Sequence, residues 1–243
     1  MRKIILGALS ISILILIWFS YSKLIANEFI LPGPIKVIKT TIDLLFLSST
    51  YKIILWSLFR LFISFVLSAV SGTLLGLMAG NFNILDELLK PLVSALRSLP
   101  IASIIIIIMI LFGRNNSLYI ITFLMIFPLV YEASKSGVQN IDQALKDNIA
   151  LETHSTWILL YRVQLPLSLP FIRTSLFQSI GLGFKVIVMA EFITQAKIGI
   201  GRELFDGSIS IQYDLVFAWT ILLIILVIIF ESILRKIKTV YEN

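Results

Sequence analysis

Long apolar stretches separated by short polar breaks dominate the sequence. A helix that spans a membrane needs roughly 20 mainly apolar residues, and several stretches approach or exceed that length. They predict an all-α integral membrane protein with about six transmembrane helices. The predicted spans are 4–20, 53–80, 88–112, 117–131, 169–194 and 215–234.

A single transmembrane domain over residues 1–243 accommodates all of these stretches. We expect residues 1–52 to hold the first span and an external surface helix. Residues 53–131 would hold the next three spans, and 132–168 a cytoplasmic loop. Residues 169–243 would hold the last two spans and a basic C-terminal tail.

The first stretch follows Arg2 and Lys3, an arrangement that it shares with signal peptides. It is therefore either a cleaved signal or an uncleaved anchor. The apolar run is long for a signal, and residues 21–26 contain no clear small-x-small cleavage site. These two features favour the uncleaved anchor.

A turn signal, Leu31-Pro32-Gly33-Pro34, comes before a short amphipathic segment over residues 35–47. Its apolar residues have the spacing of one helix face, and its other face carries lysines and an aspartate. The segment is too short and too charged to span, which predicts a helix lying on the membrane surface. The apolar face consists of Ile35, Ile38, Ile42 and Leu45.

The polar excursion over 132–168 contains no spanning stretch, but its apolar residues follow helical spacing. Two short amphipathic helices joined by a turn fit this pattern. Their apolar faces would be Ile141, Leu145 and Ile149, and then Trp157, Leu160 and Tyr161.

Composition supports the membrane interpretation. Apolar residues make up 58% of the chain and charged residues 14%, and the mean hydropathy is +0.99. An ordinary soluble domain is about 45–50% apolar and about 25% charged, so a soluble enzyme or a disordered chain is excluded. The chain has no cysteine and one histidine, which excludes disulfides, thiolate metal sites and histidine-cluster metal sites.

The basic residues predict the orientation, because lysine and arginine favour cytoplasmic loops. An internal N-terminus places the basic ends of the chain and the basic residues of the long polar loop on the cytoplasmic side. We therefore expect both termini and residues 139–165 inside. The net charge of +6 is spread along the chain and forms no dense stripe, which argues against nucleic acid as a partner.

One face of the second predicted span consists only of small residues spaced four apart. Such a face lets another helix approach closely. Packing within one subunit is the favoured interpretation, and a pore-lining or subunit-interface role remains open. The face comprises Ser64, Ser68, Gly72, Gly76 and Gly80; the fifth span repeats the pattern with Ser175, Ser179 and Gly183.

Three charged residues fall within the predicted spans, where charge is costly and often functional. We expect Arg60 to snorkel to the membrane interface. Lys185 either has a structural partner or contributes to a solute path. Glu191 lies about 600° of helical rotation further on, so it points to the opposite face, and we expect it to fix the loop at Gly199-Ile200-Gly201.

Residues 147–166 resemble the loop motif E-A-A-x(3)-G-x(9)-I-x-L-P of permease subunits of binding-protein-dependent ABC importers. The acidic position and the end of the motif correspond to Asp147, Val163, Leu165 and Pro166. The copy is degenerate, because the two alanines and the glycine are replaced by Asn148, Ile149 and Thr153.

Further motifs, in the same order along the chain, resemble the nitrate/taurine/aliphatic-sulfonate branch of these permeases. The match covers essentially the whole chain. The motifs are Leu31-Pro32-Gly33-Pro34 (L-P-x-P), Gly137-Val138-x-Asn140-Ile141-Asp142 (G-I-x-x-I-D), Leu165-Pro166-x(3)-Pro170 (L-P-x-A-L-P), Ala190-Glu191 (A-E) and Gly199-Ile200-Gly201 (G-x-G).

The resemblance implies a multi-pass permease of the bacterial cytoplasmic membrane that works with three partners. These are a cytoplasmic ABC ATPase that binds ATP and Mg, a second permease copy, with a homodimer favoured, and an external solute-binding protein. The solute would be nitrate, a sulfonate, taurine or a thiamine-pyrimidine precursor. This chain has no phosphate-binding loop of the G-x-x-x-x-G-K-[ST] type, so we expect no cofactor in it and no enzymatic activity of its own.

The resemblance also assigns residues to roles. Coupling to the ATPase would fall to Asp142, Leu145, Asp147, Ile149, Thr153, Trp157, Val163, Leu165 and Pro166. From the small face and the charge of the fifth span, we also expect this span to line the solute path with Ser179, Gly183 and Lys185. The alternative functions are a stand-alone channel and a membrane-embedded enzyme. Against them, the sequence has no convergent catalytic set and no recognisable filter or charged ring.

Overall fold

The computed structural model describes residues 2–142, 145 and 156–241, and within these ranges the regular elements are all helices. The predicted all-α class is therefore confirmed. In chain order the elements are α1 (Arg2–Ile25), α2 (Pro34–Phe46), α3 (Ser48–Ala79), α4 (Asn83–Ser98), α5 (Ile101–Gln139), α7 (Thr156–Leu159), the π-helix η1 (Leu160–Gln164), α8 (Leu165–Thr194), α9 (Ile200–Ile209) and α10 (Tyr213–Tyr241).

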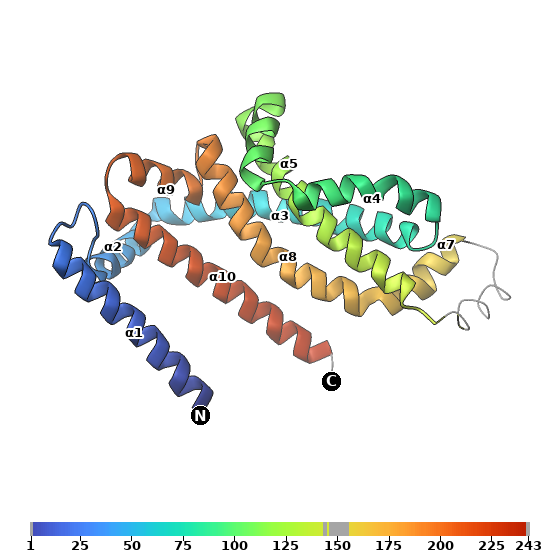
Figure 1. Cartoon of the computed structure of the whole chain (residues 1–243), viewed down its shortest axis with the longest axis horizontal. Helices are drawn as coiled ribbons and strands as arrows, with labels where there is room; N and C mark the ends of the chain where they lie inside the picture. Colours follow the sequence, from blue (N-terminus) through green and yellow to red (C-terminus); the bar gives the residue numbers. More distant parts are fainter. Residues whose placement is uncertain (1, 143–144, 146–155, 242–243) are drawn as a thin grey trace.

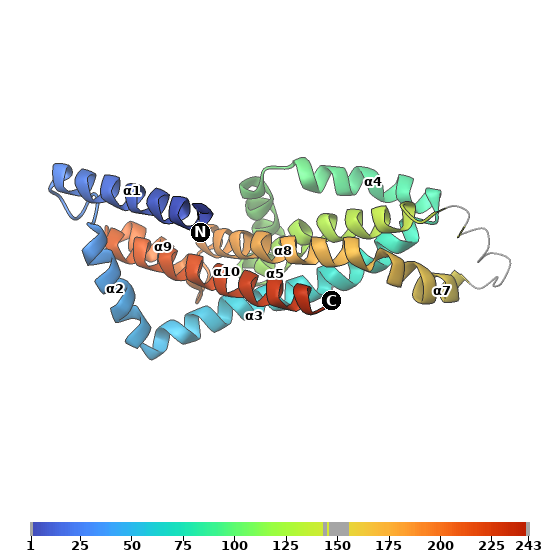
Figure 2. The same cartoon turned by 90° about the horizontal axis from the view of Figure 1, so that it is seen from below.

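Three long helices, α3, α5 and α8, pack together as the centre of the molecule. Figures 1 and 2 show α2 and α9 at one end of this bundle and α4 and α7 at the other. The main core lies between the three helices and includes Leu61, Ile126 and Ile187, and Trp219 adds to it from α10. Helix α1 diverges from the bundle (Figure 1), but its Trp18 ring stacks on Phe217 of α10 at 5.4 Å.

The row of small residues on α3 packs against α5 of the same chain. The Ser64 and Ser68 hydroxyls donate hydrogen bonds to the backbone oxygens of Tyr119 and Phe123, each at 3.0 Å. Polar side chains can therefore be buried here without losing a hydrogen-bond partner.

Further along the same row, glycines bring the two helices close together. A Cβ at Gly76 would lie within 2.6 Å of Ser134 Cβ, and a Cβ at Gly80 within 2.6 Å of Val138 Cβ. A Cβ at Gly72 would meet Val130. In this structure the whole row faces α5, which corresponds to packing within one subunit.

Four helical segments are long and apolar enough to cross a membrane: Ser48–Ala79, Ile101–Gln139, Leu160–Thr194 and Tyr213–Ile233. A shorter apolar stretch, Leu9–Ile25, lies within α1. The described part of the chain thus provides four clear candidate spans and a shorter fifth, and the predicted number of six is not confirmed.

The predicted third span, 88–112, is wrong as a single helix. Helix α4 ends at Ser98 and α5 begins at Ile101. Pro100 causes the break, because proline disfavours the helical conformation of the residue before it, and Leu99 is extended with ψ 138°. A second break falls at Gly113, where φ is +75°, at the position of the predicted polar turn.

The predicted loop over 132–168 also begins later than expected, because α5 continues to Gln139. Helix α8 already begins at Leu165, with Pro166 in its first turn. Proline is tolerated there, since the first amide groups of a helix have no intrahelical acceptor. The excursion between the two long helices is therefore shorter at both ends than the sequence indicated.

Helix α2 forms where the amphipathic segment was predicted. Its Val37 and Leu44 are buried, and the helix packs against α10, where Thr40 donates to Asp214 Oδ2 at 3.2 Å. The apolar face predicted to meet the membrane remains exposed. Its residues are Ile35, Ile38, Ile42 and Leu45.

The α3–α5 contact predicts that Gly76→Ala destabilises the protein. The added Cβ meets the α5 backbone, so we expect a loss of about 1–3 kcal/mol, typical of overpacking. Gly7→Ala in α1 is the matched control, because no atom lies within 4 Å of its Cβ position. Thermal unfolding in detergent would compare the two variants. Equal midpoints would contradict the close contact.

Candidate functional site

The rest of the chain leaves one side of helix α8 uncovered, and polar residues lie on it among apolar ones. Thr174, Gln178 and Lys185 are exposed, at the spacing of one helix face. On the other side, Ser175 and Ser179 are buried. Lys185 has no ion-pair partner among the residues that the structure describes. A lysine at the centre of a membrane helix costs about 2.5–3.5 kcal/mol, so this side is unsuited to face lipid.

A hollow of about 600 Å³ extends this polar side between α5 and α8. Glu132 and Ser136 of α5 line it opposite Thr174 and Gln178 of α8. The Glu132 carboxylate lies 3.8 Å from Lys135 Nζ. Thr174 and Gln178 thus belong both to the hollow and to the exposed side of α8 that carries Lys185.

Two of the three residues predicted for the solute path do not reach this surface. Ser179 is fully buried, and its hydroxyl donates to the Ser175 backbone oxygen at 2.7 Å. A Cβ at Gly183 would meet the side chains of Leu61 and Ile126. Both residues belong to the packed side of α8, because they are spaced four apart with Ser175. Of the three residues only Lys185 is exposed, and their assignment to a solute path stays a prediction.

At the other end of α8, Glu191 is the centre of a buried polar cluster. Its carboxylate is fully buried and accepts hydrogen bonds from Ser57 Oγ at 2.8 and 2.9 Å. Arg60 of α3 donates to it at 2.6 Å, and the Gly201 amide at 3.0 Å. A buried carboxylate needs such partners, since an unpaired one is very costly.

The same cluster fixes the loop between α8 and α9. Arg60 also donates to the Ile198 backbone oxygen at 2.6 Å, and the Ile200 amide donates to Ser57 Oγ at 3.0 Å. Gly199 has φ +155°, and a Cβ at Gly201 would collide with the Val188 backbone oxygen. The expected role of Glu191 in fixing this loop is confirmed.

The expectation that Arg60 snorkels to the membrane interface is wrong. Arg60 is only 7% exposed and forms the buried ion pair with Glu191. It lies four residues before Ser64, on the same row as the small residues that face α5. That spacing is the sequence signal that could have placed Arg60 inside the bundle.

Two polar contacts at the opposite end were not expected from the sequence. Asn81 and Gln164 exchange reciprocal amide hydrogen bonds of 2.6 Å, which tie η1 to the end of α3. Lys135 pairs with Asp86 at 2.8 Å and ties α4 to α5. The Lys135 ammonium holds the pKa of Asp86 below its usual range. The stabilisation from this pair is therefore present at neutral pH and is lost as the pH falls through that lowered pKa.

The predicted coupling residues are only partly described. Asp147, Ile149 and Thr153 lie outside the described residues, and so does most of the predicted helix–turn–helix. Asp142 and Leu145 are exposed. The other predicted coupling residues lie just before α8 or in its first turn. They are Trp157 in α7, Val163 in η1, and Leu165 and Pro166 in the first turn of α8.

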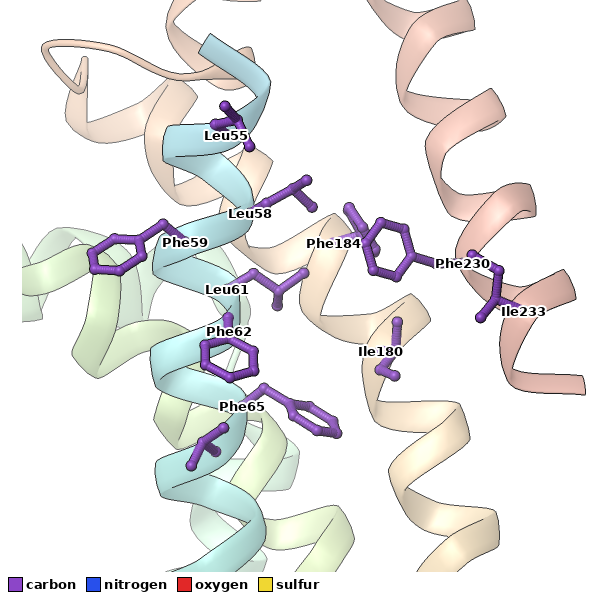
Figure 3. A pocket seen from close by; sticks show the side chains of 11 residues that line it. Leu55, Leu58, Phe59, Leu61, Phe62, Phe65, Ile180, Phe184, Phe230 and Ile233 are labelled. Carbon is purple, nitrogen blue, oxygen red and sulfur yellow. The ribbon is translucent and has the colours of Figure 1, made fainter. Parts of the chain in front are cut away.

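A groove of about 580 Å³ lies between α3, α8 and α10. Figure 3 shows Phe59, Phe62, Phe184 and Phe230 among its lining side chains. Only leucine, isoleucine, valine and phenylalanine line it. Because these side chains cannot hydrogen-bond a polar or charged solute, the groove is not a candidate for the solute path.

The described residues contain no group of three or more histidine, cysteine, aspartate or glutamate side chains that could hold a metal ion. The four long apolar helices define the class as a multi-pass membrane protein.

The chain belongs to the family described as binding-protein-dependent transport system inner membrane component, which matches residues 72–238. It is 28% identical to the nitrate import permease protein NrtB of Leptolyngbya laminosa, over 85% of this chain and 76% of the relative. It is 24% identical to a Bacillus subtilis permease protein named for aliphatic sulfonates transport, SsuC, over 96% and 84%.

The taurine transport system permease protein TauC of Escherichia coli is 23% identical, over 98% of this chain and 88% of the relative. The resemblance to the nitrate/taurine/aliphatic-sulfonate branch is therefore confirmed. These relatives are permeases of ABC importers and not enzymes, which agrees with the expectation that this chain is a transport subunit.

The Glu191 cluster predicts that Arg60→Met is strongly destabilising. It leaves a buried carboxylate without its cation, at a cost of about 3–5 kcal/mol. Adding Glu191→Gln should restore part of the loss. Arg202→Met, which removes the more exposed Arg202–Asp206 pair, is the control and should cost about 0–1 kcal/mol. Thermal unfolding of the purified variants would measure these differences, and a similar loss in both single variants would contradict the account.

Proposed function

We propose that this chain is the permease subunit of an importer for a small anion, and that it forms the solute path together with a second permease copy. The observation that carries the proposal is the exposed position of Lys185 on α8, within a segment apolar enough to span a membrane. Family membership supports the general function in transport, and the positive charge of Lys185 supports an anion as the solute.

The uncovered polar side of α8 supports the second copy. A lysine together with Thr174 and Gln178 would be costly against lipid, and a second permease facing this side would enclose it in an aqueous path. Two facing copies would place two lysines beside the solute. Such a path favours an anion, because opposite charges attract and a cation would be repelled.

The relatives support the same choice of solute. Those named above are nitrate, aliphatic sulfonate and taurine permeases, and each name denotes a solute with an anionic oxygen-bearing group. We infer that nitrate or a small sulfonate is the solute class for this chain. A thiamine-pyrimidine precursor fits less well, since it offers Lys185 no negative charge.

The energy source in this proposal is a separate ATPase. The residues between α5 and α8 would dock on it from the cytoplasmic side, with Leu145 among the contacts. A solute-binding protein would deliver the anion at the opposite end, near α2 and α9. This arrangement corresponds to internal termini in the bacterial cytoplasmic membrane.

Lys185→Met tests the charge argument. We expect the variant to be made and assembled normally, because a methionine is tolerated where a lysine was costly. Uptake of nitrate or methanesulfonate should fall about tenfold, as for the loss of a charged hydrogen bond. Lys185→Arg keeps the charge and should retain most of the uptake. Normal uptake by Lys185→Met would overturn the anion contact.

Leu145→Asp tests the coupling interface. Leu145 is 40% exposed, and a carboxylate there would have to be desolvated at an apolar contact. We expect the ATPase to be lost from the purified complex and uptake to be abolished. Ile209→Asp, at the exposed end of α9, is the control for co-purification. Unchanged co-purification and uptake for Leu145→Asp would contradict this interface.

A further inference from the structure

A second polar cavity lies at the end of the molecule that carries α2 and α9. Its volume is about 300 Å³. This is at the lower end of the range for ligand pockets, about 300–1,000 Å³, so it suits a small solute. Helix α3, the part of α5 after Gly113 and the loop after α8 contribute its lining, which consists of Trp56, Arg60, Asn115, Tyr119, Lys197 and Ile198.

The charge of this cavity is positive. Arg60 and Lys197 line it, and no acidic residue does so among the described residues. Lys197 is exposed, and the described part of the chain provides no carboxylate within ion-pair distance of it. Glu191 is fully buried and is not part of the lining. An anion entering the cavity would therefore meet Lys197, which has no carboxylate partner among the described residues, and the guanidinium of Arg60, whose charge the buried Glu191 balances.

The arginine is held in place before any solute arrives. Its guanidinium donates to Glu191 and to the Ile198 backbone oxygen, both at 2.6 Å, and lies 5.7 Å from the centre of the Trp56 ring. A cation fixed in this way loses little conformational entropy when an anion binds. The cluster that stabilises the fold thus also prepares one wall of the cavity.

The remaining polar side chains can bind an oxoanion directly. The Asn115 amide and the Tyr119 hydroxyl can each donate a hydrogen bond. Neither side chain has a hydrogen-bond partner within the described ranges. Two cations and two neutral donors around a small volume are well matched to a nitrate or sulfonate group.

We propose that this cavity is an outer anion-binding site of the transporter. The proposal rests on the proposed function for the orientation and for the class of solute. Lys185 lies nine residues before the end of α8, which is about 14 Å along the helix axis. Lys197 follows the same helix end in the loop. The cavity therefore lies closer than Lys185 to the end of the molecule that carries α2 and α9, where its positive charge would raise the local anion concentration.

The absence of cysteine from the sequence allows a direct test in the full chain. Asn115→Cys places one thiol in the cavity, and Ser210→Cys places one at an exposed position at the same end. Cells expressing each variant are treated with membrane-impermeant methanethiosulfonate reagents, one anionic and one cationic. The ratio of the two reaction rates measures the local potential, because the reactivity of the thiol itself cancels.

We expect the anionic-to-cationic ratio at Asn115→Cys to be at least about fivefold higher than at Ser210→Cys, as expected for a nearby unit charge close to water. Lys197→Gln in the Asn115→Cys background should abolish most of this difference, and Lys197→Arg should keep it. Millimolar nitrate or methanesulfonate at constant ionic strength should slow labelling at Asn115→Cys only.

Four results would each overturn the site: equal ratios at the two positions, a ratio unaffected by Lys197→Gln, no protection by either anion, and no labelling of Asn115→Cys from outside. Uptake of nitrate and methanesulfonate by the unmodified transporter separates the two proposals. If the unmodified transporter takes up the anions but the labelling ratios at the two positions are equal, the anion site is rejected and the proposed function stands. A high ratio with anion protection but no ATP-driven uptake rejects the proposed function and leaves the anion site.

Discussion

The buried carboxylate of Glu191 is the constraint on which the end of the molecule that carries α2 and α9 depends. It is fully buried and receives hydrogen bonds from Ser57 and Arg60 of α3 and from the Gly201 amide. These partners fix α8 against α3 and hold the loop before α9. Because Lys185 lies about 600° of helical rotation from Glu191, the inward position of the glutamate directs the lysine outward. The exposed position of Lys185 thus follows from the buried position of Glu191 on the same helix.

Close packing between α3 and α5 provides the second constraint. Serines and glycines spaced four apart let the helices approach until a single Cβ would collide with the neighbour. Helices in a membrane cannot rely on the hydrophobic effect to associate, so this contact and its hydrogen bonds supply cohesion. With one side of α8 buried against α3 and α5, its polar side is left uncovered.

Sequence periodicity predicted well the features that depend on one helix alone. It indicated helix α2 and the end of α8 at Thr194. It also indicated that Lys185 and Glu191 point to opposite faces of α8. It did not show which neighbour covers a face, such as the packing of Leu61 and Ile126 against Gly183. Arg60 was misplaced for the same reason, since its partner lies 131 positions away along the chain. The error at 88–112 had a local cause, because Pro100 breaks the helix within that apolar stretch.

The central claim is that the Lys185 side of α8 lines a hydrated path, and thiol reactivity tests this most directly. Cysteine is placed at Lys185 or at Ile224, an exposed α10 residue at a similar depth, eleven residues after that helix begins. A hydrophilic thiol reagent needs water, because the thiolate is the reacting form. The account predicts that Lys185→Cys reacts in the assembled transporter and that Ile224→Cys does not. An unreactive Lys185→Cys, or equal reactivity at the two positions, would contradict it.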